Sequence, residues 1–251
     1  MEDLKVKTIL VSQPKPENEK SPYFDLAGKS KLEIDFQSFI HIEGLEAGEF
    51  RKQKINLLDF GSVIFTSRNA VDHYFRMAEE MRLQIPDSMK YFCTSESTAY
   101  YLQKYVVYRK RKIFHGKGGF ADIIPLLKKY GEGRFLLPTS DVLKDIIPNT
   151  LEKHSIDYQR GIFYRTVCSD LSSLADVFYD ILVFFSPSGI KSLYQNFPDF
   201  QQNGTRIACF GPTTRKAAES EGLMVNIFAP SKEAPSMTMA IEQYVAKVNK
   251  K

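Results

Sequence analysis

Short apolar runs of strand length alternate with amphipathic stretches along the chain. The runs that predict strands are Thr8–Ser12, Leu32–Phe36, Val63–Thr66, Lys90–Cys93, Lys112–His115, Arg134–Leu137, Leu182–Ser186, Arg206–Phe210 and Val225–Phe228. Apolar residues at helical spacing predict helices over Ala70–Met81, Ala99–Tyr105, Ile123–Tyr130, Leu143–His154, Ile190–Phe197 and Thr214–Glu221. Several strands are apolar throughout, which is typical of sheets covered by helices on both faces. The alternation therefore predicts an α/β fold with doubly wound parallel sheets and right-handed crossovers.

The sequence also repeats itself weakly after about 120 residues, which favours two similar α/β units over one large sheet. Val63–Val71 resembles Val183–Lys191, and Phe92–Ala99 resembles Ala208–Arg215 in the same order. In the first pair, an apolar strand ends in hydroxyl residues and is followed directly by a helix.

The two predicted strands before residue 40 are too few to form a unit of their own. We therefore predict a discontinuous first domain, residues 1–37 and 168–251, with a second domain, residues 45–161, inserted into it. The crossings at residues 38–44 and 162–167 both contain extended segments, and we expect them to pair as a two-stranded connector.

The charge and the apolar content of the chain limit the kinds of partner that it is expected to bind. The chain has 34 Lys and Arg and 30 Asp and Glu, a net charge of +4. This is too weak to indicate a nucleic acid partner, although it suits an acidic ligand. No apolar run is long enough to span a bilayer, and the charged Met1–Lys7 segment lacks the apolar stretch of a signal peptide. We expect a cytoplasmic monomer with no membrane partner.

Hydroxyl-rich segments follow five predicted strands, where a strand gives way to a helix. They are Thr66–Asn69, Thr94–Thr98, Thr139–Asp141, Ser186–Gly189 and Gly211–Thr214. Ligands of open parallel sheets gather at the carboxyl ends of strands, and helix N-termini there suit carboxylate or phosphate. For any single segment taken alone, plain helix capping is the better explanation. A ligand site is favoured because five such ends are expected to converge between two facing domains.

Other chemistry has little support in the sequence. It contains neither GxGxxG nor a P-loop, which argues against a nucleotide. The 4 histidines are isolated and the 3 cysteines form no CxxC pair, so we predict no metal site. Tyr164 lies in the predicted connector, where its phenol would face the interdomain space and could act as an acid. A tyrosine packed between domains with a bonded hydroxyl is at least as good an interpretation.

Five segments together resemble the uroporphyrinogen-III synthase family. They are Ile64–Val71, Phe163–Val167, Phe184–Gly189, Phe210–Ala218 and Ala229–Met237. The most specific part is FFSPSG followed by GPTT. The resemblance implies two α/β domains, the first discontinuous, joined by a two-stranded connector.

It also implies an activity: closure of hydroxymethylbilane, a linear tetrapyrrole with eight carboxylates, into uroporphyrinogen III with loss of water and inversion of the last pyrrole ring. The family uses neither metal nor organic cofactor. By the resemblance, Tyr164 is the catalytic acid. The implied substrate-binding residues are Thr66, Ser67, Arg68, Thr98, Thr139, Ser140, Ser186, Ser188, Gly189, Gly211, Thr213 and Thr214.

Two positions depart from the family pattern. Gln13 stands where many members carry arginine, and Glu96 would repel an acidic substrate if it faced the cleft. Two alternatives to the enzyme remain open at this stage. One is a non-catalytic two-domain protein that binds an anion or a sugar, and the other is a catalytically silent synthase homologue.

Overall fold

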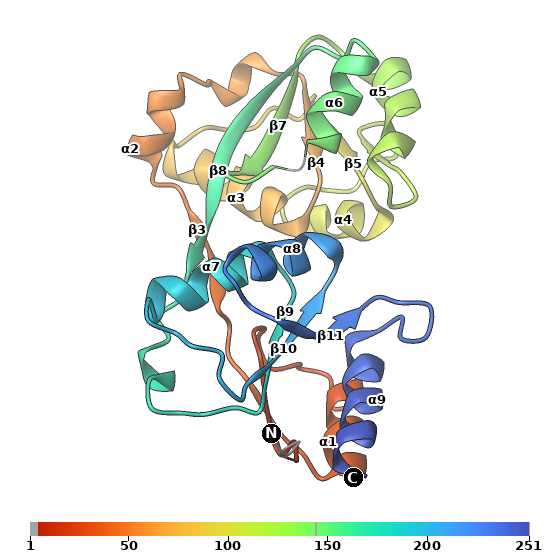
Figure 1. Cartoon of the computed structure of the whole chain (residues 1–251). Helices are drawn as coiled ribbons and strands as arrows, with labels where there is room; N and C mark the ends of the chain where they lie inside the picture. Colours follow the sequence, from red (N-terminus) through yellow and green to blue (C-terminus); the bar gives the residue numbers. More distant parts are fainter. Residues whose placement is uncertain (1–4, 144, 251) are drawn as a thin grey trace. The chain divides into compact units, whose positions relative to one another are not determined.

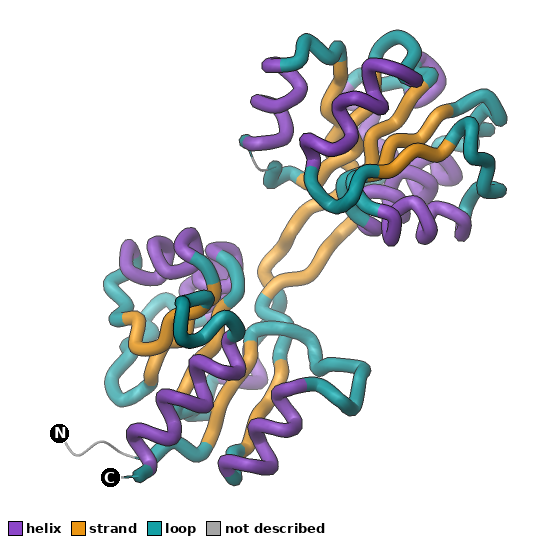
Figure 2. Tube along the Cα trace, turned by 90° about the vertical axis from the view of Figure 1, so that its right-hand side faces the viewer, coloured by secondary structure: helices purple, strands orange, loops and turns teal. Residues whose placement is uncertain are grey.

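The computed structural model describes residues 5–143 and 145–250 and divides the chain into two compact units (Figure 1). Unit 1 comprises Met1–His41 and Val167–Lys251, and unit 2 comprises Ile42–Thr166. Each unit is built on its own sheet with helices on both faces (Figure 2). The predicted α/β class with parallel sheets is confirmed.

Unit 1 contains five parallel strands in the order β11-β10-β9-β1-β2. Their bounds are β1 Thr8–Val11, β2 Glu33–Phe36, β9 Ile181–Phe184, β10 Arg206–Phe210 and β11 Val225–Ala229. The N-terminal segment supplies β1 and β2, and β1 pairs with β9, so that Leu10 lies opposite Leu182. Residues far apart in sequence therefore complete one sheet.

The two faces of this sheet explain its continuously apolar strands. Ile9 and Val183 pack with α1 (Pro22–Ser30) and α9 (Met237–Asn249), whereas the alternate residues Leu10, Leu182 and Phe184 pack with α7 (Pro187–Asn196) and α8 (Pro212–Ser220). Side chains alternate between the faces of a strand, so a strand covered on both sides must be apolar at every position. A short 3₁₀ turn, η5, spans Ser172–Leu174.

Unit 2 contains six strands in the order β3-β8-β7-β4-β5-β6, and the ladder from β8 to β6 is parallel. Their bounds are β3 Ile40–Gly44, β4 Ser62–Phe65, β5 Lys90–Cys93, β6 Ile113–His115, β7 Phe135–Ser140 and β8 Tyr158–Cys168. The strands β3 and β8 are hydrogen-bonded neighbours, and the unit boundaries fall within both.

Helices again cover both faces of this sheet. The helices are α2 Ala47–Phe50, α3 Arg68–Glu80, α4 Glu96–Tyr101, α5 Ile124–Tyr130 and α6 Ile146–Lys153, with 3₁₀ turns η1 Arg51–Gln53, η2 Leu57–Asp59, η3 Leu102–Lys104 and η4 Phe120–Ile123. Val63 and Phe65 face α3 and α4, whereas Ile64 faces α5 and α6. Among the described residues, none of the helices combines the length and apolarity needed to cross a membrane.

Element boundaries differ from the predictions in two ways. Helices α3, α4 and α7 start two or three residues earlier than their apolar periodicity predicts, because Ser67, Ser95 and Ser186 cap them. The strand predicted to end at Leu137 continues to Ser140, and the helix after it begins only at Ile146. We had expected the segment at Thr139–Asp141 to be a direct transition from strand to helix, and the structure shows that it is not.

Replacement of Tyr74 by phenylalanine should stabilise unit 2. The Tyr74 hydroxyl is buried and has no hydrogen-bond partner within the part of the chain that the structure describes. An unpaired buried hydroxyl costs about 1–3 kcal/mol, so removing it should raise the free energy of unfolding by about 1 kcal/mol in urea denaturation. Tyr101→Phe is the matched control, because the Tyr101 hydroxyl donates to the Asp72 carboxylate at 2.9 and 2.8 Å. That variant should lose stability, and loss of stability in both would contradict the prediction.

Candidate functional site

The strand orders mark one candidate site in each unit. A ligand site in an open parallel sheet lies at the carboxyl ends of two strands whose connections run in opposite directions. In unit 2 this point falls between β4 and β7, and in unit 1 it falls between β1 and β9. The predicted hydroxyl residues at the ends of β4 and β9 lie at these two points.

In unit 2, Thr66 and Ser67 lie between β4 and α3, and Ser67 is the N-cap of α3. The Ser67 hydroxyl caps this helix by accepting a hydrogen bond from the Ala70 N–H at 3.1 Å. The same oxygen lies 3.4 Å from the Tyr164 hydroxyl, which comes from β8, two strands away in the sheet. The fold thus brings the predicted acid to a predicted binding residue 97 positions away in sequence.

Tyr164 is a buried residue of unit 2, which agrees with a packed tyrosine whose hydroxyl is bonded, the second of the two interpretations of the sequence. Its side chain is 7% exposed and belongs to the same apolar cluster as Phe163. Consecutive residues of a regular strand face opposite ways, but the β7–β8 register shifts here, so that Thr139 pairs with Ile162 and Ser140 with Tyr164. This irregularity explains how both rings enter one cluster.

Burial also shifts the pKa of this phenol. Desolvation raises the pKa of Tyr164 above its ordinary value, and the hydrogen bond with Ser67 opposes the shift only in part. The Tyr164 phenol therefore keeps its proton at neutral pH and can serve as an acid.

The β5–α4 junction fits an acidic ligand poorly. Thr98 is buried, and its hydroxyl and N–H contact the Ser95 hydroxyl at 3.0 and 3.3 Å. Glu96 is exposed in the first turn of α4, where the helix dipole favours a carboxylate of the protein itself. Arg68 is exposed, and its guanidinium lies 5.4 Å from the Tyr101 ring centre. Ser95, which our site prediction omitted, is the residue that organises this junction.

Thr139 and Ser140 are part of β7 and do not start a helix. Thr139 is only 2% exposed, and its hydroxyl accepts a hydrogen bond from Arg160 Nε at 3.0 Å. The Arg160 Nη2 also donates to the carbonyls of Ser140 and Asp141 at 2.9 and 2.7 Å. These contacts correct the expected helix N-terminus at this point.

In unit 1, three predicted residues surround the start of α7. The Ser186 hydroxyl accepts a hydrogen bond from the Gly189 N–H at 3.2 Å, while Ser188 is partly exposed. A Cβ atom at Gly189 would lie 3.4 Å from Phe184 and 3.8 Å from the Ser12 hydroxyl. Ser12, which directly follows β1, is therefore a site neighbour that our site prediction omitted, although it is the last residue of a predicted strand. Gln13 beside it is exposed.

The start of α8 differs from those of α3 and α7. Its N-cap is Gly211, so within the described chain this helix start has no side-chain capping bond. Thr213 is exposed in the first turn, whereas Thr214 is only 1% exposed. A helix N-terminus whose cap residue has no side chain leaves N–H groups for an anion.

Replacement of Gly211 by alanine should destabilise unit 1. Gly211 has φ +86° and ψ 151°, a region nearly restricted to glycine. A Cβ there would meet nothing within 4 Å, so the cost of about 1–3 kcal/mol is conformational. Gly28→Ala is the control: Gly28 lies within α1 with equally open surroundings, and alanine should stabilise that helix by about 0.5–1 kcal/mol. Equal unfolding midpoints for the two variants in urea would contradict this prediction.

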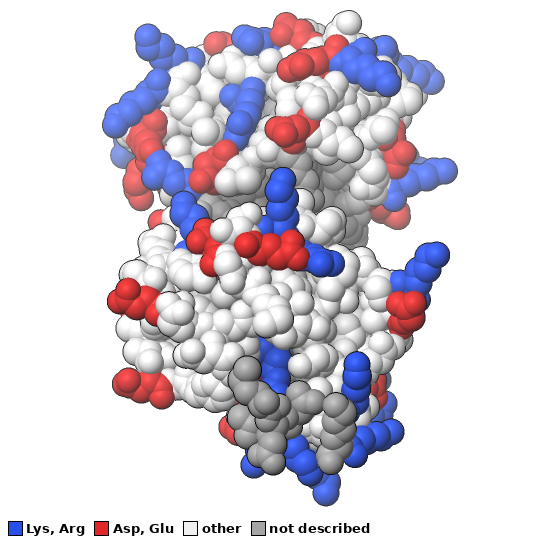
Figure 3. Space-filling view, in the orientation of Figure 1, with Lys and Arg blue, Asp and Glu red and all other residues white. Residues whose placement is uncertain are grey.

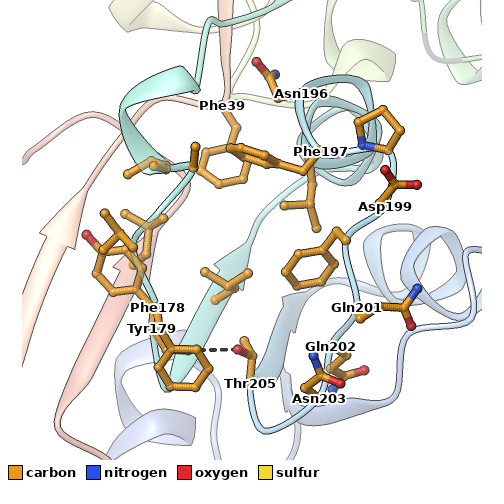
Figure 4. Close-up of a pocket in the computed structure, with 18 residues that line it drawn as sticks. Phe39, Phe178, Tyr179, Asn196, Phe197, Asp199, Gln201, Gln202, Asn203 and Thr205 are labelled. Carbon is orange, nitrogen blue, oxygen red and sulfur yellow. Dashed lines mark hydrogen bonds between the residues drawn. The ribbon is translucent and has the colours of Figure 1, made fainter.

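A cavity of about 470 Å³ in unit 1 does not match an acidic ligand (Figure 4). It lies near the residues that precede β9 and β10, at the opposite ends of the strands from Ser186 and Gly211. Phe39, Phe178 and Phe200 contribute aromatic rings, and none of the lining residues is Lys or Arg. This cavity therefore does not account for the acidic ligand that the sequence predicts, and the helix starts remain the predicted site.

Neither charged side chains nor potential metal ligands mark a site among the described residues. On the face of the molecule drawn in Figure 3, acidic and basic side chains are interspersed. Within residues 5–143 and 145–250, His, Cys, Asp and Glu side chains form no group of three or more that could hold a metal ion. Burial raises the pKa of the Cys93 and Cys209 thiols to about 12, which keeps both protonated at neutral pH.

Sequence comparison links the chain to one curated relative. A segment of 139 residues is 27% identical to the uroporphyrinogen-III synthase of Saccharomyces cerevisiae, and the match covers 49% of this chain and 50% of the yeast protein. The chain thus spans about half the length of the curated relative it matches.

Two solved structures have a similar fold. The uroporphyrinogen-III synthetase of Helicobacter pylori 26695 is 18% identical, with a TM-score of 0.61 over 96% of this chain and 100% of that chain. A mutant uroporphyrinogen III synthase of the bacterium Thermus thermophilus is 14% identical, with a TM-score of 0.54 over 98% of this chain and 100% of that chain. The family described as Uroporphyrinogen-III synthase HemD matches residues 26–239, a range that includes residues of both units. The chain belongs to the uroporphyrinogen-III synthase family.

Proposed function

We propose that the chain is a cyclising lyase that closes hydroxymethylbilane into uroporphyrinogen III, with loss of water and inversion of the last pyrrole ring. The observation that carries this proposal is the family match over residues 26–239. The hydroxyl residues at the starts of α3, α7 and α8 support it, because the substrate bears eight carboxylates and helix N-termini bind such groups.

The helix starts hold the acetate and propionate side chains of the substrate. At α8 the carboxylate is bound by the N–H groups of Thr213 and Thr214, because Pro212 has no N–H and the Gly211 N–H donates to the Ala229 carbonyl. At α3 and α7 the Ser67 and Ser186 hydroxyls take part. Holding the two ends of the linear tetrapyrrole together makes the closure effectively unimolecular. Such positioning can contribute up to about 7–11 kcal/mol to lowering the barrier.

Tyr164 supplies the acid in the first step. Its phenol proton passes to the terminal hydroxyl of hydroxymethylbilane, which leaves as water while the pyrrole nitrogen donates electrons into the vacated position. Closure then proceeds through a spiro-pyrrolenine intermediate, and the ring proton released on rearomatisation can restore the phenol. Burial raises the pKa of Tyr164, so the phenol is a weaker acid than in water but reaches the reaction with its proton in place at neutral pH.

Product identity tests the proposal directly, because hydroxymethylbilane also closes without an enzyme and then gives the non-inverted isomer. The full chain, purified and supplied with freshly prepared hydroxymethylbilane, should yield the inverted isomer in proportion to enzyme concentration. The products are oxidised to porphyrins and separated by chromatography. The isomer mixture of an enzyme-free control would overturn the proposal. Binding of a porphyrinogen analogue without turnover would instead favour a non-catalytic anion-binding protein.

A further inference from the structure

His73 lies between the proposed acid and a fixed arginine. It sits on α3, and its imidazole stacks on the Tyr164 ring with 4.9 Å between centroids and 21° between planes. The Nδ1 atom of His73 accepts a hydrogen bond from Arg76 Nε at 3.2 Å. One side chain thus joins Tyr164 to Arg76.

Arg76 is itself held in place by several groups. Its Nη2 donates to the Leu45 carbonyl at 2.8 Å and to the Phe163 carbonyl at 3.4 Å. Its Nη1 forms an ion pair with Glu80, one turn further along α3. The guanidinium also lies over Gly44, where a Cβ atom would come within 2.5 Å of Nη2. The bond to Phe163 ties Arg76 to the residue that precedes Tyr164.

These contacts fix the protonation of His73. A guanidinium can only donate hydrogen bonds, so Nδ1 must carry a lone pair and the ring proton lies on Nε2. Burial and then the Arg76 charge lower the pKa of His73, and Asp72 and Glu80 oppose them only in part. The neutral ring is therefore the form that the fold favours, and this arrangement is lost as the pH falls through the lowered pKa.

We infer that His73 is a positioning residue whose neutral imidazole, oriented by Arg76, holds the Tyr164 phenol beside Ser67 at the start of α3. Protonation of His73 removes the Nδ1 acceptor and places a cation beside Arg76, so the stack that orients Tyr164 is disturbed. The charged and titratable groups facing His73 are Asp72, Arg76 and Glu80 on α3 and Tyr164 on β8. The catalytic consequence rests on the proposed function, whereas the tautomer and its coupling to Tyr164 do not.

Nuclear magnetic resonance tests the structural part without turnover. The full chain contains 4 histidines, so loss of one imidazole signal set in His73→Phe assigns His73. Long-range ¹H–¹⁵N spectra should show the Nε2–H tautomer at neutral pH, and its titration should shift the ¹³Cζ signal of Tyr164. Arg76→Met should raise the pKa of His73, since it removes the donor and the adjacent charge. The inference would be overturned by an Nδ1–H tautomer, or by a Tyr164 ¹³Cζ signal that does not change as His73 titrates. Either result would do so even if the chain turns over hydroxymethylbilane.

Kinetics tests the catalytic part. His73→Ala should lower kcat about 10-fold, within the range that misplaced groups cost, and His73→Phe should restore part of this loss because it keeps an aromatic partner. In Arg76→Met, the acid limb of the pH–rate profile should move to higher pH by the same amount as the measured pKa of His73. The double variant His73→Phe/Arg76→Met should lack this displaced limb, because it has no imidazole at position 73. Urea denaturation checks that each variant is folded. If the limb stays in place while the pKa of His73 moves, His73 does not position the acid. Absence of turnover in the parent chain would instead count against the proposed function. The spectroscopic experiment would still decide whether His73 is coupled to Tyr164, because it does not depend on turnover.

Discussion

Replacement of Tyr164 by phenylalanine is expected to slow formation of the inverted product by roughly one to four powers of ten, around the contribution of about 10²–10⁴ from a positioned acid. Phenylalanine keeps the packing with Phe163 and the stack on His73, and removes only the hydroxyl next to Ser67. The loss should be partial, because water or a substrate carboxylate can also protonate the leaving hydroxyl. At low enzyme concentration the product should shift toward the non-inverted isomer. Rate and isomer ratio are measured in the same assay.

Two further variants separate acid catalysis from packing. Tyr100→Phe is the matched control, since Tyr100 is 73% exposed and the same change there should be silent. Tyr164→Ala removes both hydroxyl and ring and should also lower stability. If Tyr164→Phe forms pure inverted product at the parent rate while only Tyr164→Ala is impaired, Tyr164 packs and does not donate a proton.

Replacement of Thr213 by leucine should weaken substrate binding by about 10- to 100-fold. Thr213 is exposed in the first turn of α8, beside the N-cap Gly211. A bulky apolar side chain there screens the N–H groups from a carboxylate, and one hydrogen bond to a charged group contributes about 1.5–3 kcal/mol. Thr213 is preferred to Thr214 for this test because Thr214 is buried, so that its replacement would also disturb the fold. The KM for hydroxymethylbilane and the affinity for a porphyrinogen analogue are the readouts.

Lys191→Ala tests how much a side-chain charge contributes to substrate binding, for comparison with the backbone N–H groups blocked in Thr213→Leu. Lys191 is exposed on α7, and an exposed ion pair contributes only about 0–1 kcal/mol, so its loss should cost less than about fivefold. Moderate salt should likewise weaken binding only slightly. If Lys191→Ala loses more affinity than Thr213→Leu, side-chain charge rather than backbone N–H groups holds the carboxylates.

Much of the fold was predictable because its signals are local. The strands Lys90–Cys93 and Arg206–Phe210 were predicted at the bounds that the structure gives them. The weak repeat corresponds to equivalent elements, since Val63–Val71 forms the end of β4 and start of α3, and Val183–Lys191 does the same for β9 and α7. The starts of α3, α4 and α7 were predicted late, because the apolar face of each helix begins only after its capping serine and first turn. The start of α6 was predicted early, at Leu143 in place of Ile146.

The candidate site was predictable where capping chemistry appears in the sequence. Ser67 and Ser186 were chosen because they follow apolar strands, and both cap a helix at a strand end. Thr139 was chosen by the same rule, but its hydroxyl serves Arg160, 21 positions away on the neighbouring strand. Nothing in the local pattern distinguishes a capping hydroxyl from one that satisfies an adjacent strand.

The sequence by itself determined most of the strands and that the sheets are covered on two faces, because these properties depend on neighbouring residues. It did not predict helices α1 and α9 of unit 1. Only the tertiary structure decided the surroundings of Tyr164. Its contact with Ser67 spans 97 positions, and its ring enters the same cluster as Phe163 through an irregularity in the β7–β8 register. Strand register and the Arg76 contacts with Leu45 and Phe163 depend on how distant segments pack, and that packing orients His73 against the tyrosine.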